Sequence, residues 1–205
     1  MTPTLEALES RSAPYGSWAG SYVTWSIVPD GTEWSGGRSV LVSTLDRIRP
    51  GWRDEIRQAF RSWSIASGLW FTEVNDGGQP IGVHGKQQGD TRFGDIRIGG
   101  VVDPTSPLTL AWTYYPPPSS GTIAGDATFN LALNYGSGGF DLRSVALHEI
   151  GHAIGLEHSD APDSVMRSSY AGPVVMLGQS DVDLAKVIYG KAVPNPANIL
   201  SKIGA

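Results

Sequence analysis

Residues 148–158 read HEIGHAIGLEH, and the rest of the chain can be interpreted outward from this stretch. Residues four apart lie on one face of an α-helix, so His148 and His152 can present two imidazole nitrogens to one metal ion. Gly155 can adopt a left-handed backbone conformation at little cost, which lets the helix end there and the chain turn. His158 can then reach the same ion. The pattern therefore predicts a metal held by three histidines.

Three protein ligands leave a fourth position for water, as in catalytic zinc sites, whereas structural zinc sites have four protein ligands. Glu149 lies beside this position because it follows His148. Its carboxylate can act as a general base on a metal-activated water. A chance match of all the fixed positions is expected in roughly one chain of this length in a hundred thousand. Three of the four histidines lie here, so ordinary core packing is a weak alternative.

The long motif, followed by a methionine, resembles the metzincin metallopeptidases. Ser159 after the third histidine and the short connection to Met166 are most similar to the matrixins, the matrix metalloproteinase family. The resemblance implies a zincin fold of the α/β (α+β) class with a twisted, mixed, five-stranded sheet. It also implies an active-site helix, a second long helix and a small C-terminal lobe with a terminal helix. Met166 would form a packing floor beneath the metal.

The same resemblance assigns residues around the substrate. Tyr170 falls where matrixins carry a tyrosine in the wall of the S1′ pocket, which receives the side chain after the cleaved bond. Ser144 falls where they set the depth of that pocket, and its small side chain suggests an open one. Residues 108–115 resemble the strand at the upper rim of the matrixin cleft. Leu110 and Ala111 would lie there beside a substrate that adds as an extra strand.

Two further predictions concern other metals. Asp126 and Asn130 carry oxygen atoms of the kind that calcium prefers, although a polar turn explains their segment nearly as well. Typical matrixins hold a structural zinc with three histidines and an aspartate. Here the two later histidine positions fall on Trp112 and Thr128, and His84 has no histidine left to join it. A histidine-bound structural zinc is therefore not expected.

Periodicity predicts three strands and a long helix. Apolar residues alternate or cluster over residues 22–28, 69–74 and 93–98, which is typical of strands. A helix is expected from Pro50 to Gly68, because large apolar residues recur at helical spacing: Trp52, Ile56, Phe60 and Trp63. The Gly- and Ser-containing segment before Pro50 is interpreted as a loop.

Capping residues predict the ends of two other helices. Asp141 is a favourable N-cap for the active-site helix. Ser180 with Asp183 resembles a capping box for a last helix, which Gly190 would end.

The chain has 205 residues, enough for one well-buried domain. We assign residues 1–20 to a leader or pro-segment remnant and 191–205 to a tail. The matrixin-like domain would span 21–190, with an N-terminal lobe (21–158) and a C-terminal lobe (159–190). The chain has no cysteine, so a cysteine latch on the zinc is excluded. Either of two leader carboxylates, Glu6 or Glu9, could serve instead, although a solvated tail is favoured.

Composition narrows the function. The net charge of −5 and the lack of a basic run argue against nucleic-acid binding. No apolar stretch is long enough to span a membrane, and no secretory signal layout is visible, although the family suggests secretion. We therefore predict a monomeric, zinc-dependent endopeptidase that acts on proteins or peptides. The alternatives are a zinc-containing peptide-binding module and a latched protease with one dedicated partner.

Overall fold

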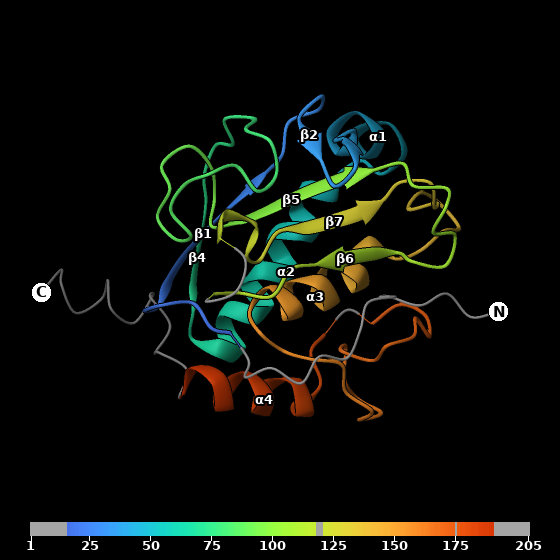
Figure 1. Ribbon diagram of the computed structural model, residues 1–205. Helices are drawn as coiled ribbons and strands as arrows, with labels where there is room; N and C mark the ends of the chain where they lie inside the picture. The colour runs from blue at the N-terminus through green and yellow to red at the C-terminus, as the bar shows by residue number, and fades with distance from the viewer. Residues whose placement is uncertain (1–15, 118–120, 175, 191–205) are drawn as a thin grey trace, which may run out of the picture.

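The computed structural model describes residues 16–117, 121–174 and 176–190. Five strands form a mixed sheet with the order β4-β1-β5-β7-β6 (Figure 1). Four of them run parallel, whereas β6 pairs antiparallel with β7 at one edge. The predicted five-stranded sheet of the α/β class is confirmed. The strands are β1 Tyr22–Ile27, β4 Trp70–Glu73, β5 Ile96–Val101, β6 Ala111–Thr113 and β7 Ala127–Asn130.

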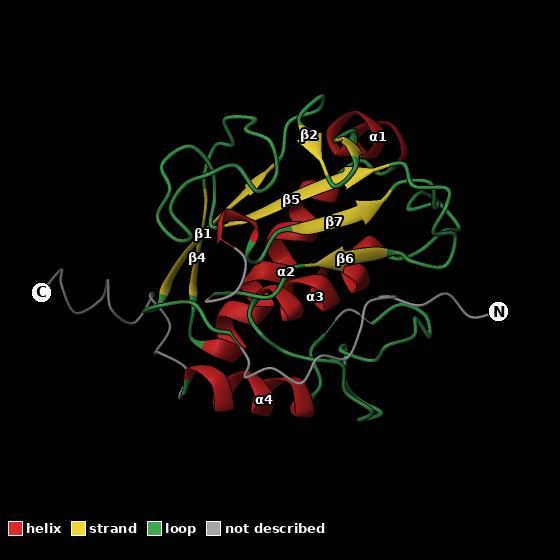
Figure 2. Cartoon of the chain, in the orientation of Figure 1, coloured by secondary structure: helices red, strands yellow, loops and turns green. Residues whose placement is uncertain are grey.

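Two long helices, α2 (Trp52–Ser67) and α3 (Leu142–Ala153), pack against one face of the sheet (Figure 1). The indole Nε1 of Trp63 joins them by donating to the carbonyl oxygen of Leu147 at 2.7 Å. Helix α4 (Gln179–Tyr189) packs against α2, and between α3 and α4 the described chain forms mainly turns and loops (Figure 2). The predicted second long helix and terminal helix are therefore present. None of the helices in the described ranges has the length and apolarity to cross a bilayer.

Helix α2 matches its prediction closely. The four large apolar residues that predicted it are all buried in the core. Gly68 ends the helix with a φ of 77°, a left-handed conformation that favours glycine, and its N–H donates to the carbonyl oxygen of Ser64. This helix supplies the apolar surface on which α3 rests.

The segment before α2 was wrongly predicted as a loop. It contains a hairpin of β2 (Glu33–Trp34) and β3 (Gly37–Arg38), followed by α1 (Leu41–Ile48). Both hairpin turn residues, Ser35 and Gly36, have positive φ values of 39° and 81°. Such values characterise the tight two-residue turn that suits the twist of a hairpin. The hairpin is too short for a clear periodic pattern, and the Ser-Gly pair is its one local signal. Helix α1 does show apolar residues at helical spacing, with Leu41 and Leu45 buried and Ile48 packed against the core, and the sequence analysis missed them.

Several element boundaries also differ. The strand expected over residues 93–98 lies three residues later, because the backbone N–H groups of Gly94 and Asp95 donate to side chains of β1 rather than to a strand. The rim strand expected over 108–115 is reduced to β6. The predicted capping box of α4 is wrong. Its cap is Gly178, whose N–H donates to the carboxylate of Asp181 at 2.8 Å.

The domain begins before residue 21. Trp18, assigned to the leader, is 3% exposed and donates from Nε1 to the carbonyl oxygen of Ala153 at 2.8 Å. Burial of a large indole stabilises this attachment. The other leader residues with a predicted role, Glu6 and Glu9, lie outside the described residues, as does the tail.

Candidate active site

Helix α3 holds the first two histidines and Glu149 rigidly. Asp141 is its N-cap as predicted, with Oδ1 accepting from the N–H of Ser144 at 2.8 Å. Nearly the whole helix is buried, and His148, Glu149 and His152 are each 0% exposed. Because the surrounding core is close-packed, the buried side chains of this helix have little room to change rotamer. The site is therefore preorganised by the core.

The turn after α3 is made by Gly155, whose φ is 97°. Leu156 N–H donates to the carbonyl oxygen of Gly151 and Gly155 N–H to that of His152, the two bonds of a Schellman motif. A Cβ at Gly155 would lie 2.5 Å from the carbonyl oxygen of Gly16. The position therefore needs glycine for both its dihedral angle and its close packing. The turn brings His158 back to the helix.

The three histidines meet as predicted. One ligand nitrogen from each of His148, His152 and His158 lies within 4.8 Å of the others, and the Nε2 atoms of His148 and His152 are 3.0 Å apart. In a tetrahedral zinc site with Zn–N distances of about 2.0–2.1 Å, nitrogens lie about 3.3 Å apart. Small adjustments of the rings would therefore suffice to fit zinc.

Backbone carbonyls fix the tautomers of the two helical histidines. Nδ1 of His148 lies 2.8 Å from the carbonyl oxygen of Val165, and Nδ1 of His152 lies 2.7 Å from that of Leu156. A carbonyl oxygen only accepts, so each Nδ1 carries the proton and each Nε2 presents a lone pair. Such outer partners orient metal-binding histidines.

Burial keeps these histidines neutral. Desolvation lowers the pKa of His148 well below its ordinary value. Together with repulsion from His158, it lowers that of His152 to about 3. Desolvation also lowers the pKa of His158. At neutral pH the Nε2 lone pairs of His148 and His152 thus face each other in a buried site. A divalent cation between the two nitrogens would replace the repulsion between their lone pairs with attraction to the metal, so the donor set fits zinc.

Met166 is buried against helix α3. It is 0% exposed, and a Cβ added at Gly151, between the two helical histidines, would lie 2.3 Å from its sulfur. The N–H of Ser159 donates to the carbonyl oxygen of Met166, which ties this turn to the segment after the third histidine.

Glu149 has a partner that the sequence analysis missed. Thr113, the last residue of β6, donates from Oγ1 to Glu149 Oε2 at 2.7 Å in a buried environment. The donor and acceptor are 36 residues apart. No local motif signals this contact, which depends on the packing of α3 against β6.

The outer edge of β6, with which no described strand pairs, lies next to this glutamate. The carbonyl oxygen of Leu110 accepts from Asn130, and Tyr114 N–H donates to Asp126, so both point toward β7 and its flanks. Backbone groups alternate in direction along a strand, so those of Ala111 and Thr113 point outward. Of the two predicted rim residues, Ala111 directs its backbone N–H and C=O groups to the outer edge, where an added strand could bind. The carbonyl group of Leu110 instead faces β7.

The predicted pocket residues share one cavity. Ser144 and Tyr170 line a space of about 240 Å³, whose other lining residues come from residues 162–174. Both are hydrogen-bonded to neighbouring backbone groups. The N–H of Asp141 donates to Tyr170 Oη at 3.0 Å, and the N–H of Val174 donates to Ser144 Oγ at 2.7 Å.

The two predicted calcium ligands differ in their surroundings. Asn130 is fully engaged, with Oδ1 accepting from two backbone N–H groups and Nδ2 facing three carbonyl oxygens. Asp126 is 0% exposed, and its Oδ1 accepts from Arg97 N–H. Its Oδ2 has no hydrogen-bond partner among the described residues. The structure thus leaves Asp126 as the better candidate ligand.

Trp112 and Thr128, at the positions of the later structural-zinc histidines, are cross-strand partners on β6 and β7. Thr128 Oγ1 accepts from the indole of Trp34 and lies 2.9 Å from the hydroxyl of Ser35. The hairpin therefore covers this part of the sheet with side chains. His84 is exposed.

The sheet, helix α3 and the histidine triad define a metallopeptidase catalytic domain of the metzincin type. Comparison with known proteins refines this class: the matrixin family model matches residues 39–190, so the chain belongs to the matrixin family. It is 36% identical over 157 residues to matrix metalloproteinase-25 of Mus musculus, covering 70% of this chain and 24% of that protein. It is also 35% identical over 141 residues to karilysin of Tannerella forsythia, covering 66% and 28%. The chain thus spans about a quarter of the length of these relatives.

Proposed function

We propose that this domain is a zinc-dependent endopeptidase that hydrolyses peptide bonds in proteins. The observation that carries the proposal is the histidine triad, whose nitrogens converge beside the buried carboxylate of Glu149. Membership of the matrixin family supports it. His148, His152 and His158 would hold the zinc, which, when bound, supplies a Lewis acid for the reacting carbonyl group.

Glu149 would act as the general base. Its carboxylate would take a proton from the attacking water and deliver it to the amine that leaves. The Thr113 hydroxyl holds one carboxylate oxygen at 2.7 Å. Because side-chain rotation is restricted in this way, the carboxylate would keep one orientation through both proton transfers.

The substrate would bind as an extended chain along β6. Outward-facing backbone groups of Ala111 and Thr113 offer donors and acceptors for an added strand. The cavity lined by Ser144 and Tyr170 would receive the side chain after the cleaved bond, called the P1′ side chain. Strand and pocket would together place the scissile bond beside Glu149.

We propose three further properties. Asp126 would contribute a carboxylate oxygen to calcium, because its Oδ2 has no partner in the described chain. The family resemblance suggests a secreted protein and a monomer. Calcium titration, cell fractionation and light scattering would test these three properties separately.

Wild type and Glu149→Ala should each bind one zinc, because Glu149 is not among the predicted ligands, and only wild type should cleave a quenched-fluorescence peptide library. The measurements are metal content and cleavage rate. Substantial cleavage by the variant would contradict the role of Glu149. Zinc in both proteins with no cleavage by either would favour the peptide-binding module or a latched, partner-specific protease.

A further inference from the structure

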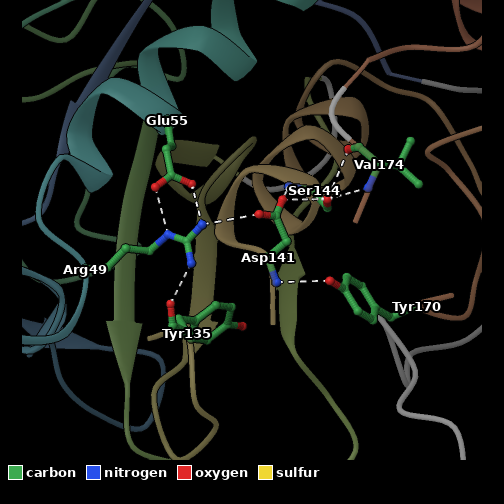
Figure 3. Close-up of polar contacts among 7 residues, drawn as sticks. All are labelled: Arg49, Glu55, Tyr135, Asp141, Ser144, Tyr170 and Val174. Atoms are coloured by element: carbon green, nitrogen blue, oxygen red, sulfur yellow. Dashed lines mark hydrogen bonds and ion pairs between the residues drawn. The ribbon is translucent and has the colours of Figure 1, made fainter. Parts of the chain in front are cut away.

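Both ends of segment 170–174 are hydrogen-bonded to the first turn of α3 (Figure 3). At one end Tyr170 Oη accepts from the N–H of Asp141 at 3.0 Å, and at the other Val174 N–H donates to Ser144 Oγ at 2.7 Å. This segment, which we call the pocket wall, lines the cavity of about 240 Å³. The size of the cavity therefore depends on these two attachments.

The Ser144 hydroxyl has one proton and two acceptors within reach. Asp141 Oδ1 lies at 2.7 Å and the carbonyl oxygen of Val174 at 3.0 Å. A carboxylate at the shorter distance is the stronger acceptor, so the proton points to Asp141. The hydroxyl oxygen then presents its lone pairs to Val174. Ser144 thereby connects a charged residue to the pocket wall, and bonds in such a chain strengthen one another.

The charged end of this chain is held from the junction of α1 and α2. Asp141 Oδ2 accepts from Arg49 Nη2 at 3.2 Å. Arg49 also binds both carboxylate oxygens of Glu55, at 2.7 and 2.8 Å, and the carbonyl oxygen of Tyr135 at 2.9 Å (Figure 3). The side chains of Arg49 and Asp141 are 22% and 20% exposed, so water competes only partly for this pair.

We propose that Arg49 and Ser144 determine the P1′ specificity of this protein by fixing the pocket wall through Asp141. Arg49 is a positioning residue, since it lies outside the cavity lining, and Ser144 both lines the cavity and holds Val174. The inference rests on the proposed endopeptidase function. It differs from the expectation of an open pocket because the serine acts through its hydroxyl rather than through its small size. A fixed wall favours a P1′ side chain of moderate size, such as leucine.

The attachment can be tested without catalysis, by hydrogen exchange at the Val174 amide. Ser144→Ala should reduce protection of this amide by ~tenfold, the effect expected from losing a hydrogen bond. Ser144→Thr keeps a hydroxyl and should retain most of the protection. Arg49→Met should reduce it by a smaller factor. Arg53→Met is the matched control, because Arg53 lies in α2 and pairs with Asp46, outside this network. Unchanged protection in Ser144→Ala would overturn the proposal.

Specificity is tested with paired peptides that differ only in a P1′ leucine or biphenylalanine. The ratio of kcat/KM for leucine over biphenylalanine should fall by ~fivefold or more in Ser144→Ala and Arg49→Met at equal zinc content, and stay constant in Arg53→Met. A constant ratio despite lost amide protection would overturn the specificity role. Absence of cleavage by zinc-loaded wild type would overturn the proposed function and the P1′ role, while the exchange data would still decide whether the wall is held.

Discussion

At the residue scale, the proposed zinc ligands and the proposed general base lie in one contiguous motif, whereas the residues that orient the site lie elsewhere in the sequence. The triad and Glu149 could be predicted because helical spacing and a glycine turn fix their geometry locally. Thr113 and Arg49 could not, since they reach the site only through sheet pairing and helix packing. These two contacts join residues 36 and 92 positions apart, so no short sequence motif could have predicted them.

Thr113 should matter for the rate of hydrolysis more than for substrate binding. Thr113→Val removes the hydroxyl that holds Glu149 while keeping the shape of the side chain, so kcat should fall by ~tenfold with KM little changed. Thr113→Ser should restore most of the rate because it keeps the hydroxyl. Steady-state kinetics at equal zinc content would measure both values. A fall confined to KM, or no rescue by serine, would contradict this role for the hydroxyl.

At the element scale, long elements were predictable and short ones were not. The aromatic repeat of α2 identifies its buried face, and both the C-cap of α2 at Gly68 and the N-cap of α3 at Asp141 agree with the structure. The hairpin of β2 and β3 carries too few residues for a period to emerge. Helix α1 was missed although Leu41, Leu45 and Ile48 recur at helical spacing, because the Gly and Ser residues before it favoured a loop. The cap of α4 was misassigned because Ser180 binds Asp163 instead, a contact from outside the helix.

The turn at Gly155 should be sensitive to any side chain. Gly155→Ala would place a Cβ against the carbonyl oxygen of Gly16 at a φ of 97°, so the loss of unfolding free energy should reach about 2–4 kcal/mol. Gly138→Ala is the control, since its φ is 72° but no atom lies within 4 Å of the added Cβ. It should cost only about 1 kcal/mol.

Urea denaturation of the zinc-loaded proteins would measure both changes. Equal losses would show that the dihedral angle alone, and not the contact with Gly16, restricts position 155. Because His158 follows this turn, Gly155→Ala should also bind zinc more weakly than Gly138→Ala.

At the scale of the whole molecule, the buried carboxyl group of Asp126 should make the free energy of unfolding depend on pH. Burial raises the pKa of Asp126 well above its ordinary value, because desolvation outweighs the attraction of Arg97. The folded state therefore retains a proton that the unfolded state releases above about pH 4. The contribution of Asp126 is fully present below that pH and is lost as pH rises through its folded pKa.

Asp126→Asn removes this titration, so its stability relative to wild type should increase from pH 4.5 to pH 7.5. Unfolding free energies from urea denaturation across this range would show the effect. Curves that stay parallel would contradict it. If Asp126 binds calcium as proposed, added calcium should stabilise wild type at pH 7.5 and leave the asparagine variant unchanged.

The outer edge of β6, which pairs with no strand in the described part of the chain, affects which proteins this domain could cut. A polypeptide can pair with that edge only if several consecutive residues have unoccupied backbone N–H and C=O groups, and residues inside helices or sheets do not. Local unfolding of a target would then precede recognition of its side chains. Susceptible bonds in a folded target should accordingly lie in exposed loops and termini, and a target's rate of degradation would depend on how often such a segment opens.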